Sequence, residues 1–292
     1  MSKQGTYVEE SYERDTEYIT DRIVADGDAD GSNGRWPVEP GRYRLVVAWA
    51  CPWANRTIIV RRLLGLEDAI SLGTPGPTHD ERSWTFDLDE GGKDPVLGTE
   101  RIQENYFTRF PDYPRGITVP AIVDVPTGGV VTNDYPQITL DLSTEWTAFH
   151  RDGAPQLIPD AGPERDEMFD VIKRVFTEVN NGVYRCGFAG SQEAYDAAYD
   201  RLFTALDWLE ERLGEKRYLM GDQITEADRA AVVAAHPRTD FKNRILQAFY
   251  DGMADRPETT FGTMNDDVLA HFDPDFHRED FVRIIQDNAW PE

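Results

Sequence analysis

The sequence predicts an α/β domain followed by an all-helical domain. Between residues 41 and 146, short apolar runs alternate with segments of helical period in the order strand, helix, strand, helix, strand, strand, helix. After about residue 163 only helical periodicity remains. The first pattern is that of a thioredoxin-like domain, and a chain of 292 residues is long enough for two buried cores.

The first domain begins with an apolar strand over 43–50, a helix that starts at Pro52 and ends at Gly65, and a short strand at 69–72. Proline suits the first helical position because its missing N–H has no partner there in any case. A long insertion runs from 73 to about 98. Because it carries the aromatic residues Trp84 and Phe86, we expect an ordered loop near a functional site.

Helical period returns over 99–110, and residues 118–133 predict a hairpin with Pro120 at the start of its first strand, where a cis peptide can be held. A helix over 135–146 completes the domain. The polar residues 1–40 are expected to lie loosely on the surface.

A linker rich in proline and glycine at 152–163 leads to helices over 164–181 and 192–213. Thr225 and Asp228 predict a helix start of the capping-box type. We therefore divide the chain into an N-terminal extension (1–40), a thioredoxin-like domain (41–150) and a helical C-terminal domain (163–292).

The formal charge of −24, from 54 acidic and 30 basic residues, argues against nucleic-acid and anionic-membrane partners, because both require a basic surface. The sequence has no recognisable signal or membrane-spanning segment, so we expect a cytoplasmic protein with Cys51 and Cys186 as free thiols. His236, His271 and His277 are irregularly spaced, and we expect no metal.

Cys51 is the principal candidate for chemistry. It stands between the strand and the helix, at the expected N-cap, where unpaired amides and the helix dipole stabilise a thiolate. Such a setting lowers the pKa of a cysteine and makes it a nucleophile. The alternative is a small buried apolar residue at a strand end.

Several motifs stand out between residues 1 and about 228. They are Gly41-Arg42-Tyr43, Ala50-Cys51-Pro52-Trp53-Ala54, Arg56-Thr57, Gly65-Leu66-Glu67-Asp68, Asp94-Pro95, Asn180-Asn181-Gly182-Val183-Tyr184, and Gly221-Asp222 with Thr225-Glu226-Ala227-Asp228. Together they resemble the Xi-class glutathione transferases, the glutathionyl-hydroquinone reductases, and the two most specific motifs are Cys-Pro-Trp-Ala and Asn-Asn-Gly-Val-Tyr.

The resemblance implies a thioredoxin-like thiol-binding domain, a helical domain and the reduction of thiol-hydroquinone adducts. Cys51 would attack the adduct sulfur, release the hydroquinone and hold a mixed disulfide. A second small thiol would resolve that disulfide, because position 54 is alanine and not a resolving cysteine. Tyr184 would face the aromatic substrate and help the hydroquinone to leave.

Residues that match the thiol-binding positions of the family are Trp53, Trp84, Val119, Pro120, Asp134 and Tyr135. Three residues also have purely structural explanations: Trp84 as a core residue, Pro120 as a turn residue and Tyr184 as a packing residue. Where the family carries a Glu-Ser pair for the γ-glutamyl arm of glutathione, this chain has Asp134 and Tyr135. The thiol is therefore glutathione bound differently, or another small thiol such as mycothiol.

After Asp228 the family pattern is lost, and the tail weakly resembles that of certain HD-domain hydrolases. The tyrosine that the family tail supplies to the aromatic pocket cannot be matched. A weakly active or non-catalytic thiol-binding scaffold is therefore the alternative to a reductase. Conjugation of thiols to electrophiles is a third hypothesis, which a cysteine at the helix start disfavours. The resemblance also implies a homodimer.

Overall fold

The computed structural model of the chain describes residues 5–8, 11–49, 51–76, 79 and 82–231, all of which belong to one compact unit, residues 1–237. The HD-like tail and the three histidines 236, 271 and 277 lie outside the described residues. Within the described part, no helix is long and apolar enough to cross a membrane.

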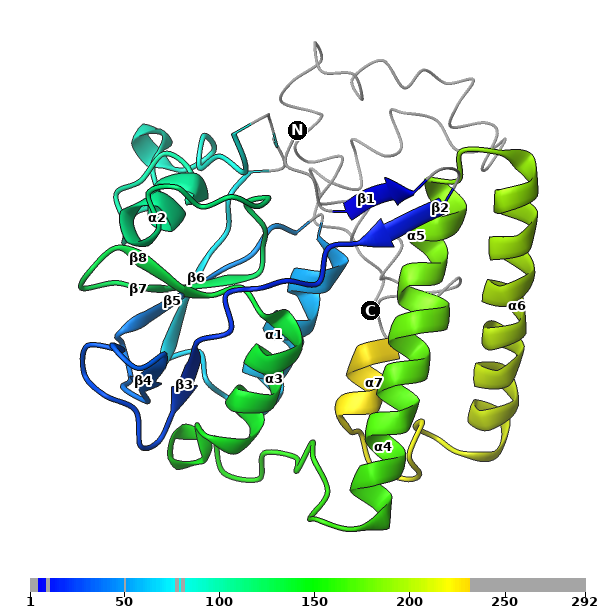
Figure 1. Ribbon diagram of the computed structural model, residues 1–292. Helices are drawn as coiled ribbons and strands as arrows, with labels where there is room; N and C mark the ends of the chain where they lie inside the picture. Colours follow the sequence, from blue (N-terminus) through cyan, green and yellow to red (C-terminus); the bar gives the residue numbers. More distant parts are fainter. Residues whose placement is uncertain (1–4, 9–10, 50, 77–78, 80–81, 232–292) are drawn as a thin grey trace, which may run out of the picture. The chain divides into compact units, whose positions relative to one another are not determined.

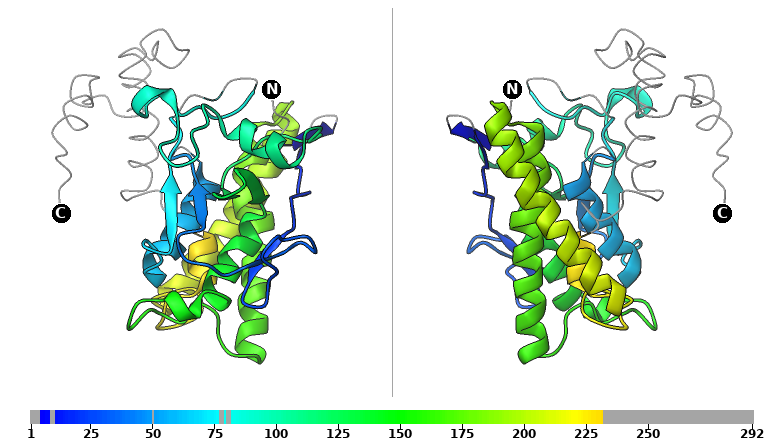
Figure 2. Two further views of the ribbon diagram at one scale, coloured as in Figure 1. Left: turned by 90° about the vertical axis from the view of Figure 1, so that its left-hand side faces the viewer. Right: turned by 90° about the vertical axis from the view of Figure 1, so that its right-hand side faces the viewer.

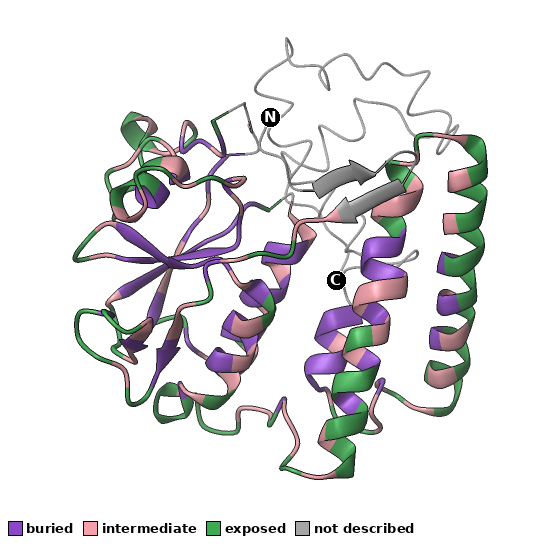
Figure 3. Ribbon diagram, in the orientation of Figure 1, coloured by how far each residue is buried: buried purple, intermediate pink, exposed green. Residues whose placement is uncertain are grey.

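A mixed sheet is the centre of the first domain, with the strand order β6-β5-β7-β8 (Figure 1). β5 (Tyr43–Val46) runs parallel to β6 (Ile70–Gly73) and antiparallel to β7 (Ala121–Asp124), which forms a hairpin with β8 (Gly129–Thr132). Every residue of β5, β7 and β8 is buried, as Figure 3 shows by its purple strands. The sheet is therefore covered on both faces.

Helices α1 (Pro52–Leu64) and α3 (Tyr135–Thr144) pack against each other beside this sheet, and α2 (Ile102–Arg109) packs on β8. Two short 3₁₀ turns also occur: η1 (Glu90–Gly92) lies before α2, and η2 (Thr147–Phe149) lies after α3. Gly65 ends α1 in the left-handed conformation, with φ of 73°, which glycine adopts without steric cost. The predicted thioredoxin-like order is present.

β5 ends four residues earlier than predicted. Beyond Val46 the chain turns, the N–H of Cys51 donates to the Ala48 carbonyl over 2.9 Å, and Trp49 is exposed. The peptide bond between Val119 and Pro120 is cis. The turn after β5 and the segment before β7 thus both deliver their residues to the same edge of the sheet, beside the start of α1.

The second domain is helical, as predicted. α4 (Pro163–Arg174), the π-helical segment η3 (Val175–Asn180) and α5 (Asn181–Gly187) form one continuous rod beside α6 (Gln192–Glu215), as both views in Figure 2 show. α7 (Glu226–Ala231) follows. The Asp228 carboxylate accepts from the N–H of Thr225 over 2.8 Å, as the predicted capping box requires.

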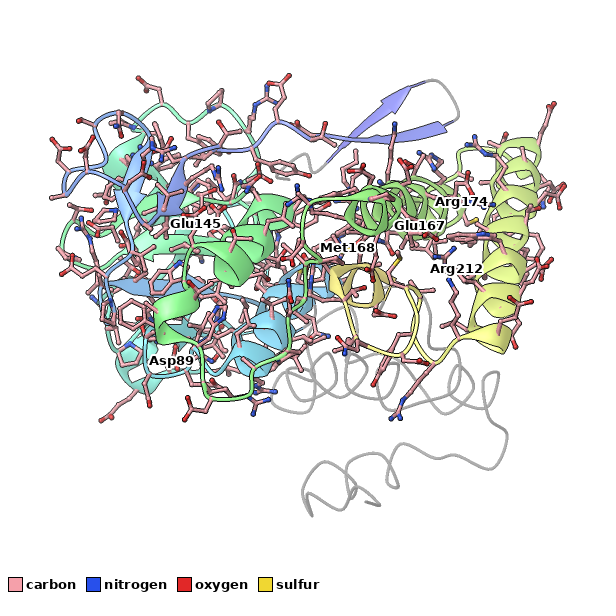
Figure 4. The ribbon with its side chains drawn as sticks, turned by 90° about the horizontal axis from the view of Figure 1, so that it is seen from below. Asp89, Glu145, Glu167, Met168, Arg174 and Arg212 are labelled. Carbon is pink, nitrogen blue, oxygen red and sulfur yellow. The ribbon has the colours of Figure 1, made fainter. Side chains whose placement is uncertain are left out.

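The helical core is apolar and is closed by charged side chains at its edge. Arg212 of α6 points to Glu167 of α4, and Arg174 lies over the Trp208 ring at 4.0 Å (Figure 4). The fully or nearly fully buried residues of this core are Met168, Val171, Val175, Val179, Leu202, Ala205, Leu209, Leu219, Ala227 and Ala231.

The prediction that residues 1–40 lie loosely on the surface is wrong for the described part of this segment. β1 (Gly5–Val8) pairs with β2 (Ser11–Arg14), and β3 (Arg22–Val24) runs parallel to β4 (Arg35–Pro37). The segment is held because Ile23 and Trp36 join the hydrophobic core and the backbone of Ile19 hydrogen-bonds the side chains of Thr132 and Asn133. Ile19, Ile23 and Trp36 are the buried residues of this largely polar segment that join the core, and three residues so far apart give no periodic signal in the sequence.

Candidate active site at Cys51

Cys51 lies at the N-cap of α1, with extended backbone angles and no capping bond from its own side chain. Its Sγ lies 3.4 Å from the Val119 carbonyl oxygen, to which the thiol donates. The cysteine is partly exposed and lines a pocket. The residues around this pocket are Arg14, Asp15, Glu17, Tyr18, Cys51, Trp53, Trp84, Tyr113, Arg115, Gly116, Thr118, Val119, Asn133 and Tyr135.

The pKa of the Cys51 thiol is raised above its ordinary value, contrary to the sequence-based expectation. Burial is the largest cause, because removal from water disfavours the charged thiolate. The backbone N–H groups of Ala54 and Trp53 and the charges of Arg14 and Arg56 act in the opposite direction. The helix start thus stabilises the thiolate as expected, but by less than burial destabilises it.

An aromatic pair and an arginine form one side of the site. The Trp53 Nε1–H donates to the Tyr184 hydroxyl over 2.8 Å, and the two rings lie 5.9 Å apart. The Arg14 guanidinium lies 4.3 Å from the centre of each ring. Its Nε donates to the Asn181 Oδ1 over 2.7 Å. The pair therefore joins α1, α5 and the N-terminal segment.

Tyr184 does not line the pocket itself, but its hydroxyl accepts the hydrogen bond from Trp53, which does. Burial is the largest cause of the raised pKa of its hydroxyl, to which the negative charge of a Cys51 thiolate would add. The phenol is therefore protonated at neutral pH, in the form that can donate a proton.

Tyr135 fills the start of α3. It is 4% exposed, its ring lies 4.9 Å from that of Trp53, and Tyr18 meets it edge to face at 5.6 Å. Burial raises the pKa of the Tyr135 hydroxyl well above its usual value. A bulky, neutral ring thus occupies the place where the resemblance implied a small hydroxyl residue.

Tyr135 lines the pocket, whereas Asp134 and Pro120, like Tyr184, do not. The Asp134 carboxylate accepts from the Gln137 N–H over 3.3 Å and so caps α3. Burial raises its pKa, and Asp141 adds to this increase. Pro120 follows the cis bond after Val119, and Val119 does line the pocket.

Trp84 lines the pocket from the long insertion, as expected for an ordered loop near a site. Its ring meets His79 edge to face at 4.8 Å. Among the described residues, its Nε1 has no hydrogen-bond partner although the atom is buried. Buried polar groups usually have a partner, and an indole N–H can act only as a donor.

Sequence reasoning missed the residues that the N-terminal segment brings to the pocket: Arg14, Asp15, Glu17 and Tyr18. It also missed Arg115, which donates to Asp15 over 2.7 Å and pairs with Glu17. The available signal was local. Charged and aromatic side chains gather at 12–18, just before the glycine-rich stretch, where a solvated linker needs no aromatic residue.

The fold and the site together define a two-domain protein in which a thioredoxin-like half carries a cysteine and a helical half completes its surroundings. Comparisons with known proteins specify this class further. The family model described as "Glutathione S-transferase, N-terminal domain" matches residues 50–145, and the one described as "Glutathione S-transferase, C-terminal domain" matches residues 192–241.

Three similar proteins extend the match. A glutathione transferase from Gordonia bronchialis is 59% identical, with a TM-score of 0.71 over 80% of this chain and 75% of that chain. The Xi glutathione transferase of Phanerochaete chrysosporium is 31% identical, with a TM-score of 0.69 over 84% and 86%. Glutathionyl-hydroquinone reductase YqjG from Escherichia coli is 38% identical over 221 residues, which are 74% of this chain.

The chain belongs to the glutathione transferase family, and its resemblance to the Xi class is confirmed. The predicted fold class, thioredoxin-like followed by helical, is confirmed as well. The matched region spans 66% of YqjG, just under two thirds of that protein. A structure of YqjG described as glutathione-bound is 33% identical, with a TM-score of 0.66 over 86% of each chain.

Proposed function

We propose that this protein is a thiol-dependent reductase that removes glutathione, or another small thiol, from thiol-hydroquinone adducts. The observation that carries the proposal is the position of Cys51, on a pocket that Trp53 and Trp84 also line, with the Tyr184 hydroxyl hydrogen-bonded to Trp53. Its relative YqjG is named a glutathionyl-hydroquinone reductase. A sulfur nucleophile beside aromatic side chains suits an adduct that joins a thiol to an aromatic ring.

In the proposed first step the Cys51 sulfur attacks the sulfur of the adduct. Before this attack the adduct shifts to its keto form, in which the phenol proton has moved to the ring carbon that carries the sulfur. A sulfur–sulfur bond then forms and the bond from sulfur to this carbon breaks, and the electron pair passes to the ring oxygen, which leaves as a phenolate and takes up a proton. The ring is reduced, and the two sulfurs are oxidised to a mixed disulfide. A second thiol then attacks this disulfide, which restores the Cys51 thiol and releases an external disulfide.

Tyr184 is the proposed proton donor for the departing hydroquinone. Its oxygen accepts from Trp53, which fixes the orientation of the phenol, and its raised pKa keeps it protonated. Positioned acids of this kind contribute about 10²–10⁴-fold to a rate.

Glutathione is the first candidate for the thiol, because the YqjG structure is described as glutathione-bound. Trp84 and the backbone of Val119 before Pro120 would hold it, with Trp53 and Tyr135 beside it. The buried ring of Tyr135 and the use of Asp134 as a helix cap favour a second candidate, a small thiol without a γ-glutamyl arm such as mycothiol.

A thiol-binding protein without efficient turnover is the alternative function. Two features favour it: the Cys51 thiol donates to the Val119 carbonyl, and its burial raises the pKa of the thiol, which keeps it in the protonated form that is a poor nucleophile. Such a protein would form a mixed disulfide at Cys51 but would release hydroquinone no faster than a free thiol does.

The test uses the full chain and its Cys51→Ser variant, with Cys186→Ser as the control, because Cys186 does not line the pocket. Adducts of glutathione and of mycothiol are supplied with the matching thiol, and hydroquinone release is followed. We expect turnover with the wild type and with Cys186→Ser, and none with Cys51→Ser. Mass spectrometry should find the mixed disulfide at Cys51 alone.

Unchanged turnover in Cys51→Ser would contradict the reductase. A stable mixed disulfide without hydroquinone release would favour the thiol-binding protein.

A second variant, Tyr184→Phe, keeps the ring and removes the proton. We expect kcat to fall about 10²-fold or more while the rate of Cys51 alkylation is retained. An unchanged kcat would remove Tyr184 from the mechanism and leave Cys51 in place.

A further inference from the structure

We propose that Arg14 stabilises the negative charge that develops on the hydroquinone oxygen as the bond between sulfur and the ring breaks. The inference rests on the proposed reductase function and assigns the recognition of the leaving group to the N-terminal segment. Arg14 would thus be a catalytic residue of a domain-spanning site, supplied from outside the thioredoxin-like domain.

The position of Arg14 supports this role. Its side chain lines the pocket that Cys51 also lines, and its guanidinium lies 4.3 Å from the centres of the Trp53 and Tyr184 rings. The bond from its Nε to Asn181 Oδ1, at 2.7 Å, fixes the plane of the group. A cation so held needs little reorganisation when charge appears nearby, and preorganised charge of this kind is the most effective.

The anchor of Arg14 is itself fixed. The Asn181 side-chain amide donates to the Phe176 carbonyl in η3 over 3.0 Å, and Asn181 is 6% exposed. The π-helical segment η3 therefore fixes the Asn181 side chain that in turn holds the Arg14 guanidinium. π-Helical turns of this kind occur frequently at functional sites.

A positive group favours the proposed step. In the keto form of the adduct the ring carbon that carries the sulfur already holds a proton, so the electron pair of the breaking bond passes through the conjugated π bonds to the ring oxygen and leaves a phenolate. The negative charge disappears when this oxygen receives a proton. A guanidinium near that oxygen lowers the energy of the charged state and leaves the neutral adduct almost unaffected, which raises kcat.

The other cations near Cys51 are placed differently. Arg115 lines the pocket but is held between the carboxylates of Asp15 and Glu17, which offset its charge. Arg56 does not line the pocket, and its guanidinium donates to the Ala230 carbonyl in α7 over 2.7 Å. Of these three arginines, Arg14 is thus the one that both contacts the aromatic pair and lines the pocket.

The experiment compares the wild type with Arg14→Gln, Arg14→Lys and, as a control, Arg62→Gln, an exposed arginine of α1 that does not line the pocket. The substrates are adducts of one thiol with hydroquinones whose phenols range from acidic, with chlorine on the ring, to weakly acidic, with methyl groups. Because Arg14 also lowers the pKa of Cys51, rates are divided by the thiolate fraction, measured by iodoacetamide alkylation across pH.

We expect kcat of Arg14→Gln to fall by about 10²–10³-fold for the weakly acidic hydroquinones, the loss seen when one stabilising donor of a developing oxyanion is removed. The loss should be smaller for the chlorinated ones, whose oxygens need less stabilisation. A plot of log kcat against phenol pKa should therefore be steeper than in the wild type. Arg14→Lys keeps the charge and should keep the wild-type slope, and Arg62→Gln should match the wild type.

An equal loss for all adducts, or none, would overturn the role of Arg14. The same steepening in Arg14→Lys as in Arg14→Gln would overturn it too, because packing and not charge would then be responsible. If Arg14→Gln does not fold, Arg14→Met, which keeps an unbranched side chain and removes the charge, takes its place and should show the same steeper slope. The wild type is assayed first. If it reduces no adduct, the proposed reductase function is wrong, and this result is distinct from any result on Arg14.

Discussion

The thiol of Cys51 is subject to two opposing effects. The start of α1 and two arginines favour the thiolate, whereas burial in the pocket favours the thiol, and burial is the larger effect. The thiol form also donates to the Val119 carbonyl. A group balanced in this way becomes more reactive with any change that brings water or positive charge to the pocket.

The pH dependence of Cys51 alkylation follows from the raised pKa. We expect the rate of iodoacetamide alkylation to rise with pH and to reach half of its plateau above about 8.5, the ordinary pKa of cysteine, because the reactive thiolate forms only there. The measurement is made in a Cys186→Ser background, so that Cys51 is the single cysteine. Arg14→Gln in that background should move the midpoint further up. A midpoint below 8 would show that the helix start outweighs burial.

Sequence reasoning brought several residues to the pocket and missed others for a physical reason. Cys51 follows from a local strand-to-helix pattern, Trp53 from the resemblance to the family, and Trp84 from an aromatic residue in a long loop. The charged and aromatic cluster at 12–18 marks the segment of Arg14 but not its place in the site, because the residues that fix its guanidinium, Trp53 and Asn181, are far away in the sequence. The sign of the Cys51 pKa shift was missed because burial is a property of tertiary packing.

At the scale of elements, boundaries were harder to predict than the elements themselves. A single helix over 164–181 was predicted, whereas the structure continues through η3 and α5 to Gly187. Apolar spacing identifies the buried face of a helix. It cannot distinguish an α-helical from a π-helical turn, because the extra residue in a π-helical turn rotates the buried face but leaves it apolar. The π-helical segment η3 directly precedes Asn181 and Tyr184 of α5.

The start of α3 allows a matched pair of stability predictions at Asp134. Asp134→Ala removes the acceptor for the Gln137 N–H and should lower the free energy of unfolding by about 1 kcal/mol. Asp134→Asn keeps an oxygen acceptor and removes a buried charge. Thermal unfolding of both variants and the wild type across pH separates the cap from the charge.

The pH at which the charge matters follows from its sign. Because burial raises the folded-state pKa of Asp134, the wild type loses stability from this group as pH rises above the ordinary aspartate value and through the raised pKa. The Tm of Asp134→Asn, relative to the wild type, should therefore increase between about pH 3.5 and pH 7. A constant difference would mean that the carboxyl titrates alike in the folded and unfolded chains.

At the scale of the whole molecule, the dominant feature is an excess of acidic residues, 54 against 30 basic ones. Many of the basic residues are already engaged: Arg22, Arg42, Arg44, Arg109 and Arg212 each pair with a carboxylate in the described part of the chain. The remaining acidic residues therefore repel one another across the surface. Such repulsion destabilises a folded chain and is screened by salt.

Salt should consequently stabilise this protein. Raising NaCl from about 0.05 to 0.5 M shortens the screening length from more than 10 Å to less than 5 Å, and we expect Tm to rise over that range. A triple variant of α6, Asp207→Asn, Glu210→Gln and Glu211→Gln, removes three exposed charges and should show a smaller rise from a higher starting Tm. Because α6 carries no pocket residue, adduct reduction serves as a check that the site is intact. If Tm fell with salt in both proteins, the ion pairs of the five arginines would outweigh the surface repulsion.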